Sequence, residues 1–383
     1  MMEAFVVAAV RTPVGRRGGA LAHMHPADLS AVVLRELIER SGVDPSAIDD
    51  VLMGCVGQVG AQASNIARTA VLSAGLPETV PGTTIDRQCG SSQQAVHFAA
   101  ASVASGMQDL VIAAGVEVMS LVPLGSATTA GEAAQLGHPR KGQSWQQRFG
   151  NHAFTQFAGA DLIAERWKIT REQMEVYALE SHRRAITAQE EHSFADEIIA
   201  VNDIADDEGP RRNTSLKKMA GLDPLSVDSR LTAATSSQLS DGAAGLLIAS
   251  ARAVQTHNLK PIARISAADV IGSDPYEMLS GTIPATRRAL KKAGRSMADI
   301  GHFEVNEAFA SVVLAWQKEL NADPEMTNPL GGAIALGHPL GATGARLMTS
   351  LVHAMRRNQT QWGLQVMCEG GGMANATVFE LMT

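Results

Sequence analysis

Short apolar runs alternate with segments of helical spacing along most of the 383-residue chain. Between the first two runs, Leu29, Val33 and Leu37 recur at the spacing of one helix face, which predicts a helix over residues 29–40. Strands separated by helices are typical of an α/β fold whose sheet is mostly parallel and covered by helices. The predicted strands are residues 6–10, 51–56, 110–116, 246–249, 263–267, 303–305, 364–368 and 376–381.

The order of these elements repeats 252 residues further along the chain. Each copy has a glycine after a helix, an isoleucine six residues later and a short strand, namely Gly42, Ile48 and residues 51–53 in the first copy and Gly294, Ile300 and residues 303–305 in the second. Cys89 and His338 then each open an apolar helix that leads to a further strand. The alternative is that two generic βα segments resemble each other by chance. We interpret the chain as two similar βα halves.

Residues 120–239 separate the two copies and are more polar and charged than either. Thr170 and Gln173 form the pattern of a capping box, which predicts a helix that runs towards Glu190. Residues 203–212 have the composition of a solvated loop. A polar insertion on a repeated scaffold is a natural place for substrate binding. The predicted domains are an N-terminal half of residues 1–119 and 240–260, an inserted loop domain of residues 120–239, and a C-terminal half of residues 261–383.

Composition and charge exclude several classes of protein. The chain is 45% hydrophobic and 19% charged, as is usual for a globular protein, and its net charge of −7 argues against a nucleic-acid partner. No apolar run reaches the ~18 residues that span a membrane, and the first residues lack the pattern of a signal peptide. We therefore expect a cytoplasmic protein without membrane insertion.

The three cysteines, Cys55, Cys89 and Cys368, are an odd number at wide spacing, which suits a reducing compartment better than a disulfide framework. His23 and His25 stand on a predicted loop without a cysteine or carboxylate pattern beside them, so we expect no metal site. The sequence also lacks the glycine-rich nucleotide loops and the serine-hydrolase elbow. Nucleotide hydrolysis, Rossmann redox chemistry and serine hydrolysis therefore lose support.

Cys89 stands in the segment Asp-Arg-Gln-Cys-Gly-Ser-Ser, residues 86–92, between a short strand and a helix. A thiol at a helix N-terminus feels the positive end of the helix dipole, which predicts a lowered pKa and a larger thiolate fraction. Free N–H groups at the same point can hold a developing oxyanion. The alternative is a buried structural cysteine, which is how we interpret Cys55.

Three further clusters stand at equivalent ends of the repeated units. They are Asn-Glu-Ala-Phe-Ala at residues 306–310, Gly-Gly-Ala-Ile-Ala-Leu-Gly-His-Pro-Leu-Gly-Ala-Thr-Gly at residues 331–344, and Cys-Glu-Gly-Gly-Gly-Met at residues 368–373. The second cluster brings His338 to a helix start, with Pro339 at the first helical position. The third places Cys368 at a strand end beside glycines that permit close backbone approach. Together the clusters predict one converging site.

These four motifs, in this order, resemble those of the thiolase family, and the resemblance extends over essentially the whole chain. It implies the thiolase fold, an α/β fold in which two similar βα halves stack as five layers, α-β-α-β-α, with a loop domain inserted in the first half. It also implies homodimers or homotetramers. Coenzyme A is then the co-substrate, and no cofactor is permanently bound.

The resemblance assigns roles to five residues. Cys89 matches the nucleophile that accepts the acyl group, and Cys368 matches the acid/base that exchanges a proton with the substrate α-carbon. His338 matches the residue that activates the nucleophile and, with a water held by Asn306, lines one oxyanion hole. The N–H groups of Cys89 and Gly370 match a second oxyanion hole.

The resemblance also indicates residues that contact the substrate. Ser237 aligns with a serine that contacts the pantetheine arm of CoA. Gln156 and Phe157 stand where acetoacetyl-forming relatives carry a His-Met pair beside the acyl group. Two further departures, Ser-Gln in place of Gly-Leu at residues 92–93 and Glu369 in place of a small or apolar residue, are similar to degradative thiolases of actinobacterial type, including steroid-catabolic ones.

The implied reaction is thiolytic cleavage of a 3-ketoacyl-CoA by CoA, which yields acetyl-CoA or propionyl-CoA and a shortened acyl-CoA through an acyl-Cys89 intermediate. Fatty-acid or steroid degradation is the expected setting. The main alternative is a biosynthetic acetyl-CoA acetyltransferase that makes acetoacetyl-CoA. A related condensing enzyme would lack the second catalytic cysteine, Cys368, and an inactive thiolase-like carrier would not need the full set of motifs.

Overall fold

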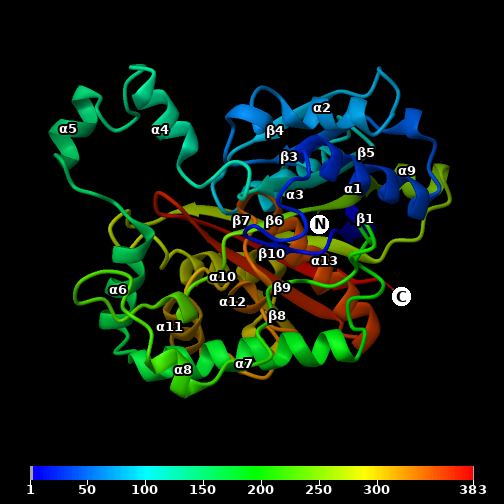
Figure 1. Ribbon diagram of the computed structural model, residues 1–383. Coiled ribbons are helices and arrows are strands. Elements are labelled where there is room, and N and C mark those ends of the chain that lie inside the picture. The colour runs from blue at the N-terminus through cyan, green and yellow to red at the C-terminus, as the bar shows by residue number, and fades with distance from the viewer. Residues whose placement is uncertain (1–2, 383) are drawn as a thin grey trace.

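One ten-stranded sheet forms the centre of the molecule in the computed structural model, which describes residues 3–382 (Figure 1). The strands are β1 (Ala4–Arg11), β2 (Gly15–Arg16), β3 (Asp50–Gly54), β4 (Gly82–Ile85), β5 (Leu110–Val118), β6 (Ser240–Ser250), β7 (Ala263–Gly272), β8 (His302–Val305), β9 (Trp362–Glu369) and β10 (Met373–Leu381). They follow the order β4-β3-β5-β6-β1-β7-β10-β9-β8, and β2 lies beside β6. Each of the eight apolar runs coincides with one of these strands, so those predictions are confirmed.

The sheet consists of two copies of one strand arrangement, joined where β1 pairs with β7 at Phe5 and Val6. Outward from this joint, the order is β1-β6-β5-β3 on one side and β7-β10-β9-β8 on the other. The helices that precede β3 and β8 end at Gly42 and Gly294, whose φ angles of 68° and 66° are left-handed and favour glycine. The predicted repeat of two βα halves is therefore confirmed.

The expectation of a mostly parallel sheet was wrong, because the sheet is mixed. Parallel pairing occurs in β3–β4, β3–β5 and β8–β9, where helical connections return the chain to the same end of the sheet. The pairs at the centre, from β5–β6 through β1–β7 to β9–β10, are antiparallel. Residues 370–372 connect β9 to β10, and three glycines are too short for a parallel crossover.

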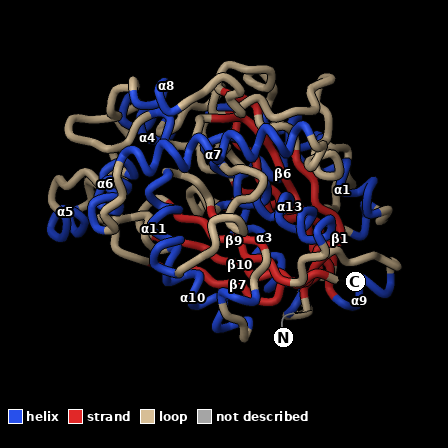
Figure 2. The backbone as a smooth tube through the Cα atoms, turned by 90° about the horizontal axis from the view of Figure 1, so that it is seen from below, coloured by secondary structure: helices blue, strands red, loops and turns tan. Residues whose placement is uncertain are grey.

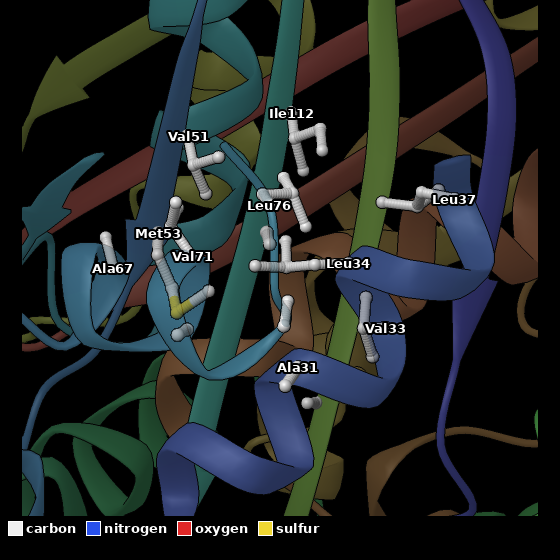
Figure 3. Packing of buried hydrophobic residues seen from close by; sticks show 14 of the residues in the cluster. Ala31, Val33, Leu34, Leu37, Val51, Met53, Ala67, Val71, Leu76 and Ile112 are labelled. Atoms are coloured by element: carbon white, nitrogen blue, oxygen red, sulfur yellow. The ribbon is translucent and has the colours of Figure 1, made fainter. Parts of the chain in front are cut away.

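Helices form three layers that alternate with the two halves of the sheet. The helices concerned are α1 (Pro26–Ser41), α2 (Ile66–Ser73), α3 (Ser91–Ala104), α10 (Thr282–Ala293), α11 (Ala310–Leu320) and α13 (Leu340–Asn358), with the short α9 (Ala251–Thr256) and α12 (Ala333–Leu336) between them in the chain. On the outer face of the first half, Leu34 of α1 and Val71 of α2 pack against Val51 and Ile112 (Figure 3). This packing is one apolar core.

The middle helical layer is α3 and α13, whose apolar side chains pack with strands of both halves. Val96 and Leu351, for example, share one buried cluster with Val111 of the first half and Phe379 of the second. Helices α10 and α11 cover the outer face of the second half, where strands β7, β10 and β9 lie side by side (Figure 2). The predicted five layers are therefore confirmed.

The chain between β5 and β6 forms α4 (Ser126–Ala133), α5 (Gln143–Phe149), α6 (Gln156–Arg166), α7 (Arg171–Glu190) and α8 (Leu216–Ala220). Figure 1 shows α4 and α5 standing away from the sheet, whereas α7 runs along the second half. The predicted capping box is confirmed, because Gln173 N donates to Thr170 Oγ1 at 3.2 Å and Thr170 N donates to Gln173 Oε1 at 2.8 Å.

Residues 203–212 are less solvated than predicted. Asp207 is buried, and its Oδ1 lies 2.7 Å from Nη1 of Arg11 on β1. Glu197 Oε1 lies 2.5 Å from Nε of the same arginine. Because Arg11 is itself fully buried, these two carboxylates offset the cost of removing its charge from water. The charged composition of the segment could not show that one carboxylate points inward.

The predicted division into three domains stays a prediction. Its boundaries fall just after β5, just before β6 and just before β7, and residues 1, 2 and 383 of the predicted halves lie outside the described residues. Within residues 3–382, no helix combines the length and the apolar composition that crossing a membrane requires.

Candidate active site

Cys89 lies in a tight turn between β4 and α3. Gln88 adopts a left-handed backbone with φ of 50°, and the Ser91 hydroxyl donates to Gln88 O at 2.6 Å, which holds the turn. The Cys89 side chain is 7% exposed. The backbone N–H groups of Cys89 and Gly370 lie near its sulfur and favour its negatively charged form. The turn therefore aims two backbone donors at one thiol.

Both helices beside the predicted catalytic residues begin later than predicted. α3 begins at Ser91, and α13 begins at Leu340 with Pro339 as its N-cap rather than as its first helical residue. Cys89 and His338 therefore lie in the connecting segments just before these helices. Their side chains are positioned by the hydrogen bonds of those segments.

The prediction of a lowered Cys89 pKa was wrong. Burial removes the thiol from water and raises its pKa to about 12, and the carboxyl group of Glu369 adds to the rise. The two N–H groups at the sulfur act in the opposite direction. In the resting protein Cys89 is a neutral thiol, so it needs a base when it attacks. Burial of the thiol raises its pKa more than the nearby N–H groups lower it.

His338 is a neutral imidazole with one defined tautomer. Its Nδ1 lies 2.7 Å from Thr343 Oγ1, and that hydroxyl donates its hydrogen to Pro339 O at 2.8 Å. Because this hydrogen is already used, Thr343 can only accept from His338, so the imidazole proton lies on Nδ1 and Nε2 is free to accept another. Burial, with Arg346 nearby, lowers the His338 pKa to about 3. His338 is thus unprotonated at Nε2 at neutral pH, so this nitrogen is open to a proton from a neighbouring group.

Asn306 lies beside the free nitrogen of His338. It follows β8 directly, and its N–H donates to Val366 O at 3.0 Å. Its Nδ2 is 3.5 Å from His338 Nε2, whereas its buried Oδ1 has no hydrogen-bond partner in the described part of the chain. A buried amide oxygen without a partner is costly. The Asn306 amide is therefore available to a ligand group or a water.

Cys368 lies at the end of β9, close enough to Cys89 for the two thiols to interact electrostatically. It is fully buried, and burial, with smaller contributions from the ionised forms of Cys89 and Glu369, raises its pKa well above that of a free thiol. The two glycines after Gly370 have left-handed φ angles of 88° and 79°, which favour glycine. This turn brings the N–H of Gly370 back to the Cys89 sulfur.

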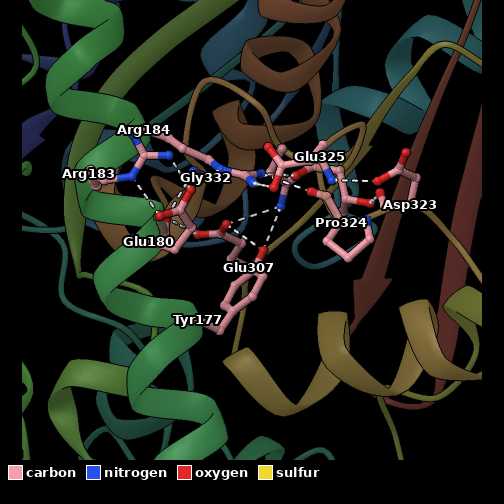
Figure 4. A network of polar contacts seen from close by, with 12 residues as sticks. Tyr177, Glu180, Arg183, Arg184, Glu307, Asp323, Pro324, Glu325 and Gly332 are labelled. Atoms are coloured by element: carbon pink, nitrogen blue, oxygen red, sulfur yellow. Dashed lines mark hydrogen bonds and ion pairs between the residues drawn. The ribbon is translucent and has the colours of Figure 1, made fainter.

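A buried carboxylate, Glu307, ties together three segments around the site (Figure 4). Its Oε1 accepts from Tyr177 OH at 2.7 Å, and its Oε2 accepts from Ser181 Oγ at 2.7 Å and Ile334 N at 3.0 Å. Tyr177 and Ser181 belong to α7, and Ile334 belongs to α12, which leads to His338. Sequence reasoning gave Glu307 no role. The available signal was a carboxylate two residues after a buried strand.

The residues predicted to contact the substrate line one cavity of about 620 Å³. Ser237, Gln156 and Phe157 share this cavity with His338. Phe157 is 41% exposed, and its ring meets the ring of Phe309 edge-on, with 5.5 Å between the centroids. The structure thus brings these four residues together.

Cys89 lies behind the wall of this cavity. It packs against Met119 and Leu340, which both line the cavity. Guanidinium groups also face the cavity, and such groups bind phosphate and carboxylate anions. They belong to Arg16, Arg17 and Arg211.

Comparisons with known proteins agree with this arrangement. Residues 4–252 match the family model described as thiolase, N-terminal domain, and residues 259–381 match the one described as thiolase, C-terminal domain. The chain is 53% identical to a steroid 3-ketoacyl-CoA thiolase of Mycobacterium tuberculosis, over 99% of this chain and 94% of that protein. It is 42% identical to a beta-ketoadipyl-CoA thiolase of Escherichia coli, over 99% of this chain and 100% of that protein.

A solved structure shares the fold. The crystal structure of the Bacillus anthracis acetyl-CoA acetyltransferase matches with a TM-score of 0.89 and 37% sequence identity, over 100% of this chain and 99% of that one. The two family models together cover nearly all of the described residues. The chain therefore belongs to the thiolase family of acyltransferases.

Proposed function

We propose that the protein catalyses CoA-dependent thiolytic cleavage of a 3-ketoacyl-CoA in fatty-acid or steroid degradation. The observation that carries the proposal is a neutral His338, free to accept a proton at Nε2, in a site with two buried thiols, Cys89 and Cys368. One thiol suffices for acyl transfer, whereas chemistry at carbon also needs a proton donor. The relatives named as steroid 3-ketoacyl-CoA and beta-ketoadipyl-CoA thiolases support the degradative direction.

In the first half-reaction, the Cys89 sulfur attacks the 3-keto carbon and its proton passes to His338 Nε2. The N–H groups of Cys89 and Gly370 stabilise the oxyanion of the adduct. The C2–C3 bond then breaks and its electron pair passes to C2. Cys368 protonates C2, while His338 and Asn306 face the enolate oxygen. Acetyl-CoA or propionyl-CoA leaves, and the shortened acyl group stays on Cys89.

In the second half-reaction, a CoA thiol removes the acyl group. The proton on His338 first returns to the Cys368 thiolate, which restores both groups. The incoming CoA thiol then attacks the acyl-Cys89 carbonyl and gives its proton to His338 Nε2. When the carbon–sulfur bond to Cys89 breaks, His338 returns this proton to the leaving sulfur. The cycle is ping-pong and consumes one CoA.

CoA binding is supported by the cations that line the cavity and its neighbour. A second cavity of about 440 Å³ also contains Arg211 in its wall. Its other cationic residues are Arg212 and Lys218. Phosphate groups of CoA match such a cluster in charge. We propose that they bind here, with the pantetheine arm passing Ser237 towards Cys89.

Thr343→Val should lower kcat for thiolysis by about 10- to 100-fold while changing KM less. Valine keeps the shape of threonine but leaves the His338 Nδ1–H buried without an acceptor, which costs about 1–3 kcal/mol, and each 1.36 kcal/mol is tenfold in rate. Steady-state kinetics measure the effect. Thr343→Ser is the matched control, because it keeps the hydroxyl and should retain most of the activity. Equal losses in both variants would show that the hydroxyl does not orient His338.

We also propose that the enzyme prefers 3-ketoacyl-CoAs larger than acetoacetyl-CoA, including ring-bearing ones. Phe157 lines the cavity, is partly exposed and meets Phe309 only edge-on, so its ring has room to swing aside for a bulky acyl group. The expected result is a kcat/KM at least about tenfold higher for long or ring-bearing substrates, as each extra buried methylene contributes about 0.8 kcal/mol.

A thiolysis panel with purified enzyme, CoA and short, long and ring-bearing 3-ketoacyl-CoAs tests the reaction and the size preference together. Cleavage of any member supports the proposed reaction. A preference for acetoacetyl-CoA over every longer substrate would contradict the size preference and favour an acetyl-CoA acetyltransferase, the name of the solved relative. Failure to cleave any of them would contradict the proposed function itself.

The remaining expectations, a cytoplasmic location and a homodimer or homotetramer, stay predictions. Exposed apolar side chains flank α4, which stands away from the sheet (Figure 1), and exposed apolar surface favours self-association. These side chains are Leu121 and Leu136.

A further inference from the structure

The two halves of the fold carry equivalent glutamates at the ends of equivalent strands. Glu117 is near the end of β5, and Glu369 ends β9, 252 residues later. Both are buried. The carboxylate of Glu117 accepts from the N–H groups of Val56, Gly57 and Gly341 at 2.9, 3.0 and 2.9 Å. In the first half, this position therefore fixes the backbone at the start of α13.

Glu369 occupies the same position of the second half but makes none of these bonds. Both of its oxygens are buried without a hydrogen-bond partner among residues 3–382. The carboxyl group lies against Gly90, where an added Cβ would stand only 1.9 Å from Oε1. It therefore packs on Gly90, the residue that follows Cys89. It also lies next to Cys368 in the chain.

The charges around Glu369 are few. Arg87 is the cation that faces it, and the Arg87 Nη1 also contacts the sulfur of Met373 at 3.7 Å. Two further titratable groups near Glu369, Asp86 and Cys89, belong to the same turn as Arg87. A third, Cys368, belongs to β9. The first turn of α3 and the start of β10 contribute no titratable group. Beyond the glycine turn, the carboxylate of Asp274 accepts from backbone N–H groups of its own segment.

An ionised Glu369 would oppose every anion that the proposed reaction forms. Its negative charge raises the pKa of both Cys89 and Cys368. The same charge would lie beside the N–H of Gly370, which stabilises the oxyanion in the proposed mechanism. The neutral acid fills the same space without this repulsion. Geometry and charge therefore favour the neutral, protonated form of Glu369 during turnover.

We propose that Glu369 is a positioning residue that acts as a neutral acid, packing on Gly90 so that the N–H groups of Cys89 and Gly370 stay aimed at the reacting sulfur and oxygen. This inference rests on the proposed thiolase reaction. Ionisation of Glu369 then stops the chemistry and sets the upper pH limit of activity.

The pH range of this limit follows from the position of Glu369. Burial raises the pKa of its carboxyl group to about 8, and Arg87 opposes the rise. An acid with a raised pKa is neutral below that value and charged above it. Activity should therefore be complete below about pH 8 and fall as the pH rises further. Thiol ionisation alone would produce the opposite trend.

The test compares Glu369→Gln with Glu369→Ala and the wild type in thiolysis assays from neutral to alkaline pH. The wild type should lose about tenfold in kcat/KM per pH unit above the limit, as expected for loss of one proton. Glu369→Gln keeps the volume and stays neutral, so its profile should lack this decline. Glu369→Ala removes the packing, so kcat should fall about 10- to 100-fold at neutral pH with a smaller change in KM, and its profile should also lack the alkaline decline. Glu78→Gln, at an exposed glutamate, is the control.

Two results would overturn the inference. One is a Glu369→Gln profile that superimposes on the wild type, and the other is a folded Glu369→Gln protein as inactive at neutral pH as Glu369→Ala. Alkylation of Cys89 in the wild type gives a readout that needs no variant and no turnover. Its rate reports whether the buried thiol is intact and held above the ordinary thiol pKa of about 8.5, as its burial requires. A wild type that alkylates as expected but cleaves no 3-ketoacyl-CoA would count against the reaction and not against Glu369.

Discussion

Cys89→Ala should reduce the thiolysis of a 3-ketoacyl-CoA by at least about 10⁴-fold, because no acyl-enzyme can form without the sulfur. The side chain is 7% exposed and lies behind the cavity wall, so alanine should leave the cavity and the CoA contacts intact. Binding of acetyl-CoA, measured by calorimetry, should therefore change by less than about threefold. The loss should appear in kcat.

Cys55→Ala is the matched control for this experiment. Cys55 is also a buried thiol, but it belongs to the apolar core that contains α1 and α2. Its loss should lower stability by about 1–2 kcal/mol while kcat stays within about threefold of the wild type. An active Cys89→Ala protein, or an inactive Cys55→Ala protein of native fold, would refute the assignment of the nucleophile.

Cys368→Ala should separate the two halves of the reaction. Acetyl transfer between acetyl-CoA and Cys89 involves no proton transfer at carbon, so exchange of labelled CoA into acetyl-CoA should survive within about tenfold. Thiolysis needs protonation of C2, so it should fall by about 10³-fold or more, the range of general acid catalysis. Isotope exchange and steady-state thiolysis, measured on one preparation, give the ratio directly.

Cys368→Ser is a useful companion variant. A serine hydroxyl is nearly isosteric but is a much weaker acid than the thiol, so thiolysis should remain low while the packing at the end of β9 is preserved. Equal loss of exchange and thiolysis in both variants would mean that Cys368 supports the structure or acts on Cys89 instead of on the substrate carbon.

Most of the fold could be predicted because the repeat of the two halves is visible in the local sequence pattern. Gly42 and Gly294 mark equivalent left-handed helix ends, and strands β3 and β8 follow them at the same spacing. Strand direction was not predictable in this way, since it depends on where each connection returns the chain. The burial of Asp207 was missed for a similar reason, because its partner Arg11 is far away in sequence.

The candidate site could be predicted as a set of residues but not as an electrostatic environment. The motifs identified Cys89, His338 and Cys368, yet the direction of the Cys89 pKa shift depends on burial by segments distant in sequence. Thr343 and Glu369 lie within the motifs of residues 331–344 and 368–373. Neither residue could be given a role from the sequence, because the contacts appear only in the fold. The Thr343 hydroxyl lies against the His338 imidazole, and the Glu369 carboxyl group lies against Gly90 in the turn of Cys89.

The central claim, a covalent acyl-enzyme at Cys89, is tested most directly by acid-quenching the enzyme during turnover and mapping its peptides by mass spectrometry. Incubation with a 3-ketoacyl-CoA before CoA is added should leave the shortened acyl group on the peptide that contains Cys89. Subsequent addition of CoA should remove it. An acyl group on Cys368 or Cys55, or product formation with no acylated peptide before CoA is added, would contradict the account.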